Sequence, residues 1–191
     1  MGLTFLQSSH TYILDGEQLP CVSELLHPLH AAIYGEVSPS VMEQAAIRGS
    51  AVHAATEALD AAGQAQIPEE YLPYVQAYVR FIAEHSVRWR FTEKPLYHPS
   101  LRYAGTIDRY GLVDGGFVLM DIKTTYTVNR ALVRAQLSLY YMMLRARGIP
   151  VDKLMVLHLK KDGSYRLIEI PFDQPLAISL ITIHQALKKG N

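Results

Sequence analysis

Cysteine is almost absent from this chain: Cys21 is the single one among 191 residues. One thiol cannot form an intramolecular disulfide, a Cys-x-x-Cys zinc knuckle or the four-cysteine ligand set of an iron–sulfur cluster. We therefore expect Cys21 to be a small buried hydrophobe, and we expect no iron–sulfur cluster.

Several other sequence features are missing as well. No uncharged apolar run is long enough to span a bilayer, and residues 1–15 have neither the basic start nor the apolar stretch of a secretory signal. There is no Gly-rich loop followed by Lys and Ser or Thr, and no Gly-x-Ser-x-Gly elbow. These absences favour a cytoplasmic protein with no membrane partner, no ATP-driven work and no serine nucleophile.

A net charge of zero argues at first against a nucleic-acid partner, but the charges are unevenly distributed. Residues 1–87 contain two basic residues against ten acids, whereas residues 88–191 contain sixteen against eight. Coulomb attraction and counterion release would draw a phosphate-rich partner to the second half. The acidic half would then face away or dock another protein. The alternative is that these charged side chains are simply solvated and bind no partner.

The pattern of apolar residues predicts one mixed α/β domain with a sizeable core. An Asp-Gly turn at 15–16 predicts a small hairpin. Ser23 and Ser38 are predicted to cap two helices, and Pro28 is expected to interrupt or end the first of these helices. Apolar residues three and four apart predict a third helix. The predicted helices are 23–34, 38–62, 68–89, 129–147 and 173–189, and the predicted strands after the third helix are 94–99, 102–113, 116–122, 153–159 and 164–171.

Polar residues interrupt this apolar pattern at two strand positions. Asp108 lies in a predicted strand, and Asp121 follows four consecutive apolar residues in the next one. The turn Asp114-Gly115-Gly116 makes the two strands antiparallel, so both aspartates are expected to become neighbours. Two carboxylates from adjacent strands can hold a hard divalent cation, and Lys123 points from the same strand face into the same cavity.

These motifs together resemble the PD-(D/E)XK nuclease superfamily, and within it the RecB-like branch that includes phage recombination exonucleases and CRISPR-associated nucleases. The resemblance rests on a Gly-x-x-Asp strand, an apolar strand ending in Asp-x-Lys-Thr, and a helix with Gln136 and Tyr140. An upstream Arg-Gly-Ser-Ala-Val-His segment at 48–53 resembles the first motif of that branch. The resemblance extends over roughly residues 48–140.

The resemblance implies a restriction-endonuclease-like core, a mixed β-sheet flanked by helices in the order α-β-β-β-α-β. We assign residues 36–191 to this core and residues 1–35 to an N-terminal appendage of a hairpin and a helix, within a single domain. The resemblance also implies metal-dependent hydrolysis of DNA that leaves 5′-phosphates, in the cytosol of a bacterium or a phage-infected host.

An exonuclease acting on DNA ends in recombination, repair or phage DNA processing is the function we expect. A non-catalytic module that keeps the fold and binds nucleic acid, or docks a partner, is the alternative. The acidic half is the expected docking surface for a recombination or replication protein. The sequence leaves the oligomeric state open.

The predicted metal centre holds one or two Mg²⁺ or Mn²⁺ ions. Its predicted ligands are Asp108, Asp121 and the Ile122 carbonyl, with His53 added by resemblance. Glu57 shares a helix face with His53 and is a weaker candidate. An imidazole ligand favours manganese relative to magnesium.

Lys123 is predicted to position or deprotonate the attacking water, or to stabilise charge on the phosphorane. Gln136 and Tyr140 share a helix face and are predicted to support the site by hydrogen bonding, although an ordinary surface pair is the alternative. The predicted DNA-contacting residues are Arg48, Thr124, Thr125, Arg130 and Arg134.

The principal site residues have simpler alternatives. Asp121 and Lys123 can form a plain salt bridge, and Asp108 can pair with Arg109. His53 can be a satisfied core histidine on an alanine-rich helix.

Overall fold

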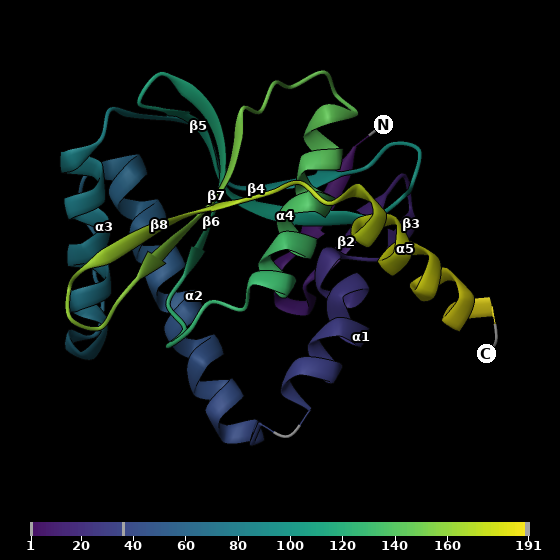
Figure 1. The fold of residues 1–191 in the computed structure, drawn as a ribbon, viewed down its shortest axis with the longest axis horizontal. Coiled ribbons are helices and arrows are strands. Elements are labelled where there is room, and N and C mark those ends of the chain that lie inside the picture. Colours follow the sequence, from purple (N-terminus) through teal and green to yellow (C-terminus); the bar gives the residue numbers. More distant parts are fainter. Residues whose placement is uncertain (1, 36, 190–191) are drawn as a thin grey trace.

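The computed structural model describes residues 2–35 and 37–189, which form eight strands and five α-helices (Figure 1). The strands are β1 (Leu3–Leu6), β2 (Thr11–Leu14), β3 (Glu17–Leu19), β4 (Val87–Tyr97), β5 (Ala104–Val113), β6 (Gly116–Lys123), β7 (Lys153–Leu159) and β8 (Tyr165–Ile170). The helices are α1 (Val22–Tyr34), α2 (Pro39–Ala62), α3 (Leu72–Glu84), α4 (Arg130–Arg145) and α5 (Gln174–Lys189), with 3₁₀ turns η1 (Gln7–Ser9) and η2 (Glu69–Tyr71). Within the described ranges, no helix has both the length and the apolar character needed to cross a bilayer.

The larger sheet has five strands in the order β4-β5-β6-β7-β8. Strands β4, β5 and β6 form an antiparallel meander, whereas β6 and β7 are parallel and are therefore connected by a crossover through α4. The chain thus follows α3-β4-β5-β6-α4-β7, which confirms the predicted mixed α/β fold and its α-β-β-β-α-β order. A separate antiparallel sheet, β1-β2-β3, precedes it.

Helices cover both faces of the five-stranded sheet. Apolar residues of α1, α4 and α5 pack on one face, and those of α2 and α3 pack on the other. Figure 1 shows α2 and α3 on one side of the sheet and α4 and α5 on the opposite side. Strand β6 alternates between these layers, because Leu119 contacts the first cluster while Met120 and Ile122 contact the second.

Helix α2 begins and ends where its sequence predicts. The Ser38 hydroxyl accepts a hydrogen bond from the Val41 amide at 3.4 Å, with Pro39 in the first turn. At the other end Gly63 adopts a left-handed conformation with φ 70°, and its amide donates to the Leu59 carbonyl. These signals fix the helix that carries His53.

The predicted third helix, 68–89, is wrong at its C-terminal end. Helix α3 stops at Glu84, and β4 begins at Val87 rather than at residue 94. Residues 87–91 alternate between partly buried apolar side chains and exposed arginines, which is the period of a strand and not of a helix. The longer β4 brings Glu93 into the sheet.

The N-terminal region also differs from prediction in detail. Strand β1 adds a third strand to the expected hairpin, and Pro28 lies inside α1 without ending it. Cys21, rather than Ser23, precedes the first turn of α1, and its amide donates to Glu24 Oε2 at 2.8 Å. Cys21 is buried, as expected of it.

Candidate metal and phosphodiester site

The hairpin between β5 and β6 brings the two predicted aspartates to the same part of the sheet. Arg109 pairs with Met120 in the antiparallel ladder, so continuing that register places Asp108 beside Asp121. Asp108 is 8% exposed and Asp121 is 2% exposed. Asp108 Oδ2 accepts a hydrogen bond from the Ile122 amide at 2.7 Å. Both carboxylates are therefore held at the end of β6 with little access to water.

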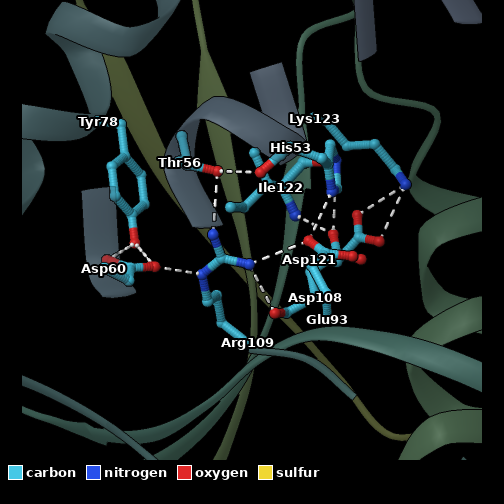
Figure 2. Close-up of polar contacts among 10 residues, drawn as sticks. All are labelled: His53, Thr56, Asp60, Tyr78, Glu93, Asp108, Arg109, Asp121, Ile122 and Lys123. Carbon is cyan, nitrogen blue, oxygen red and sulfur yellow. Dashed lines mark hydrogen bonds and ion pairs between the residues drawn. The ribbon is translucent and has the colours of Figure 1, made fainter. Parts of the chain in front are cut away.

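Lys123 is paired with the more buried of these carboxylates. Its Nζ lies 2.9 Å from Oδ1 and 2.9 Å from Oδ2 of Asp121 (Figure 2). It also donates to Gln136 Oε1 at 3.1 Å. Burial raises the pKa of the Asp121 carboxyl, and the Lys123 ammonium opposes that rise. Gln136 thus contacts the site from α4, as predicted, and the salt bridge weighed as the simpler alternative is present.

His53 reaches the same place from α2. Its Nδ1 lies 3.0 Å from Glu93 Oε1, and its Nε2 lies 3.1 Å from the Ile122 carbonyl and 3.7 Å from Asp108 Oδ2. Burial lowers the pKa of the imidazole, but Asp108 and Glu93 outweigh that effect and raise it to about 9. Both ring nitrogens of His53 thus lie within hydrogen-bonding distance of oxygen atoms, one of Glu93 and one of Ile122.

Glu93 is the one member of this cluster that the sequence interpretation missed. Thr92 pairs with Arg109 and Lys94 pairs with Ile107, which puts Glu93 across from Asp108 in the β4–β5 ladder. Its backbone has φ 43°, an unusual left-handed conformation for a glutamate in a strand. Strand alternation does not signal its place, because a β-bulge between Trp89 and Phe91 puts these two side chains in opposite hydrophobic clusters.

One nitrogen of His53 and one oxygen each of Glu93 and Asp108 lie within 4.8 Å of one another. These three residues form the candidate metal cluster, and the Ile122 carbonyl is in contact with it through His53. Asp121 is not a member of this group, and its part as a ligand remains a prediction. Its Oδ2 is buried and has no hydrogen-bond partner of acceptable geometry, despite the nearby ammonium.

A fully buried arginine supports the cluster from behind. Arg109 Nη1 donates to Glu93 Oε1 at 3.0 Å, and Arg109 Nε donates to Asp60 Oδ2 at 2.7 Å. Its Nη2 donates to Thr56 at 2.9 Å, and Tyr78 donates to both oxygens of Asp60 at 2.7 Å (Figure 2). Arg109 therefore pairs with Glu93 and Asp60, rather than with the Asp108 carboxylate as the simpler alternative supposed.

The cluster opens into a cavity of about 790 Å³. The predicted residues Glu57, Thr124, Thr125 and Tyr140 line it, together with His53, Asp108, Ile122 and Lys123. Burial raises the pKa of the Tyr140 hydroxyl well above its usual value, with Asp108 and Asp121 adding to the effect. Most of the predicted site residues thus share one cavity.

Three predicted DNA-contacting arginines do not line that cavity. Arg48 packs over the Tyr74 ring at 5.8 Å, and Arg134 points toward Asp173, with Nη1 3.8 Å from Oδ2. Arg130 is exposed at the start of α4. Any contact that these residues make with DNA would be outside the cavity.

Comparisons with known proteins give a likeness in structure only. No family model matches the chain, and no curated protein is similar to it in sequence. Similar solved structures include the crystal structure of SSO0001, at 16% identity and a TM-score of 0.48, covering 87% of this chain and 75% of that one. Another is an alkaline exonuclease (LHK-Exo) from Laribacter hongkongensis, at 14% identity and a TM-score of 0.47, covering 89% of this chain and 87% of that one.

Proposed function

We propose that this protein is a divalent-metal-dependent deoxyribonuclease that acts on DNA ends and leaves 5′-phosphates. The observation that carries the proposal is the convergence of His53, Glu93 and Asp108 within 4.8 Å, in the same cavity as Lys123. The basic half of the chain supports a phosphate-rich partner. So does the resemblance of the motifs at 48–53, 105–108 and 121–124 to RecB-like exonucleases.

The residues present fit a Mg²⁺ or Mn²⁺ ion. One imidazole nitrogen, two carboxylates and a neighbouring carbonyl are hard or borderline ligands that suit these cations. The buried Asp121 Oδ2 atom, which lacks a hydrogen bond, is a further oxygen donor. His53, Glu93, Asp108 and the Ile122 carbonyl would hold the first ion, and Asp121 would contribute to it or to a second. A bound cation supplies positive charge to the phosphate and lowers the pKa of water.

The protein residues supply the remaining chemistry. Lys123 is a partly buried ammonium that offsets the charge developing on the phosphate, because Asp121 and Gln136 hold its Nζ in position. Asp121 keeps that ammonium in place through its two oxygens, each 2.9 Å from Lys123 Nζ.

The test is incubation of linear and closed-circular DNA, single- and double-stranded, with Mg²⁺, Mn²⁺ or chelator. The wild type should degrade linear DNA in a metal-dependent reaction, and the Asp121→Ala and Lys123→Ala variants should not. Intact DNA in all samples, including the wild type, would instead favour a module that binds nucleic acid without cleaving it. Docking of a replication or recombination protein on the acidic half, and a cytoplasmic location, remain predictions.

A further inference from the structure

Two aromatic rings border the cavity on the side of the N-terminal sheet. Phe5 of β1 and His10, which follows η1, both line the cavity, with ring centroids 5.3 Å apart and ring planes at 90°. Phe5 is half-buried and His10 is exposed. We refer to these two residues as the aromatic wall. Parts of both rings are thus accessible to a molecule that enters the cavity.

The aromatic wall is fixed to β5, the strand that carries Asp108. Phe5 stacks on Tyr12, with ring centroids 4.6 Å apart, and His10 contacts the same ring edge-to-face at 5.6 Å. Tyr12 is 1% exposed, and its hydroxyl is hydrogen-bonded to Thr106 Oγ1 at 2.8 Å. Thr106 also lines the cavity and lies two residues before Asp108. The aromatic wall is therefore linked through Tyr12 and Thr106 to the strand that carries Asp108.

A different wall of the cavity is lined mainly by small side chains. Helix α2 contributes Ala45, Gly49, Ser50 and Ala54 in addition to His53 and Glu57. A Cβ built on Gly49 would meet nothing within 4 Å. Small residues at these positions keep that part of the cavity free of bulky side chains.

We propose that the aromatic wall stacks a nucleobase of an unpaired DNA strand, so that the site takes single-stranded DNA or a frayed end rather than an intact duplex. This inference rests on the proposed function, because it names the form of DNA that the site accepts. Base faces are accessible only where a base is unstacked, and aromatic side chains bind such faces without sequence preference. Asp108 lines the cavity and is only 8% exposed, so the strand must enter the cavity to reach it.

The test measures binding without hydrolysis. Fluorescence anisotropy in chelator compares an internally labelled oligothymidylate, the same backbone with abasic sites, and a blunt hairpin duplex. The wild type should bind oligothymidylate more tightly than the other two. Phe5→Leu should weaken oligothymidylate binding by at least about fivefold, the equivalent of about 1 kcal/mol at 1.4 kcal/mol per tenfold. Phe5→Leu should leave the affinities for the abasic strand and the hairpin unchanged. Phe5→Trp, which keeps an aromatic ring, should bind oligothymidylate as tightly as the wild type does.

His10→Asn provides a second variant that removes an exposed ring and keeps a residue suited to the left-handed backbone at φ 49°. It should weaken oligothymidylate binding in the same selective way, and circular dichroism of each variant checks the fold. Equal binding of oligothymidylate by the wild type and both variants would overturn the inference, as would equal binding of hairpin and single strand by the wild type. A selective loss in Phe5→Leu together with no metal-dependent cleavage would refute the proposed function and leave the stacking intact.

Discussion

The edge of the Tyr140 ring packs against the bare backbone of Gly105. A Cβ built on Gly105 would lie 2.7 Å from Tyr140 Cε1 and 3.0 Å from Val22 Cγ2, closer than side chains approach one another. Gly105 thus allows α1 and α4 to approach β5 three residues before Asp108. Gly105→Ala should lower the free energy of unfolding by about 1–3 kcal/mol, because buried side chains must shift to admit the methyl group. Urea denaturation measures this change.

Gly49→Ala is the matched control for that substitution. Gly49 lies inside α2 with open space around it, so alanine there should raise the free energy of unfolding by about 0.5–1 kcal/mol. Similar effects of the two substitutions would contradict the close approach at Gly105.

Arg109→Leu should be strongly destabilising. The guanidinium is 0% exposed and pairs with Asp60 and Glu93, so its removal leaves two carboxylates without their cation. Breaking a buried ion pair in this way costs about 3–5 kcal/mol. Arg102→Leu serves as the control, because Arg102 and Glu17 form an exposed pair worth about 0–1 kcal/mol. Thermal unfolding of both variants would show the contrast, and equal melting temperatures would argue against the buried network.

Glu93→Gln should weaken manganese binding at least about tenfold, whereas Glu57→Gln should leave it nearly unchanged. Glu93 contributes an oxygen to the cluster with His53 and Asp108, and Glu57 lines the cavity without belonging to that cluster. Calorimetric titration of the two purified variants with Mn²⁺ measures the affinities. The opposite ranking would return the metal site to the pair His53 and Glu57 that the helix spacing indicated.

His98 should make stability depend on pH below neutrality. Burial, together with Arg147, lowers the pKa of His98, and its Nδ1 accepts a hydrogen bond from the Leu101 amide at 3.1 Å. The imidazole of the unfolded chain takes up a proton near pH 6.5, whereas that of the folded chain does so only at a lower pH. The contribution of neutral His98 to the free energy of unfolding is therefore fully present above about pH 6.5 and is lost as pH falls toward the folded pKa. The stability advantage of the wild type over His98→Asn should therefore be larger at about pH 8 than at about pH 5.5. Denaturant titrations at both values check this, and a constant difference would refute it.

Much of the fold could be predicted because local signals agree with tertiary structure. Ser38, Pro39 and Gly63 delimit α2, and the turn Asp114-Gly115-Gly116 fixes the β5–β6 hairpin. The predicted strand 153–159 coincides with β7. In each case a cap, a turn or a change in apolar period marks the boundary within a few residues.

The candidate site was less predictable where it depends on contacts distant in sequence. Glu93 acquires its place through a left-handed backbone and a pairing with Arg109 sixteen residues away, and no short motif encodes either. The helical spacing of residues 71–85 continues far enough to hide the start of β4. By contrast, Asp108, Asp121 and Lys123 lie on two strands joined by a tight turn, so their proximity follows from local sequence.

The parallel pairing of β6 with β7 has a consequence for synthesis on the ribosome. A nascent chain that has not yet extended past Leu159 has β6 as an edge strand, with the buried residues around Asp121 open to solvent and to other chains. Strand β7 covers that edge only about thirty residues after Lys123, because α4 and its connections lie between the two strands in the sequence. During that interval β6 can pair with strands of other chains, so the nascent protein is prone to aggregate at this edge.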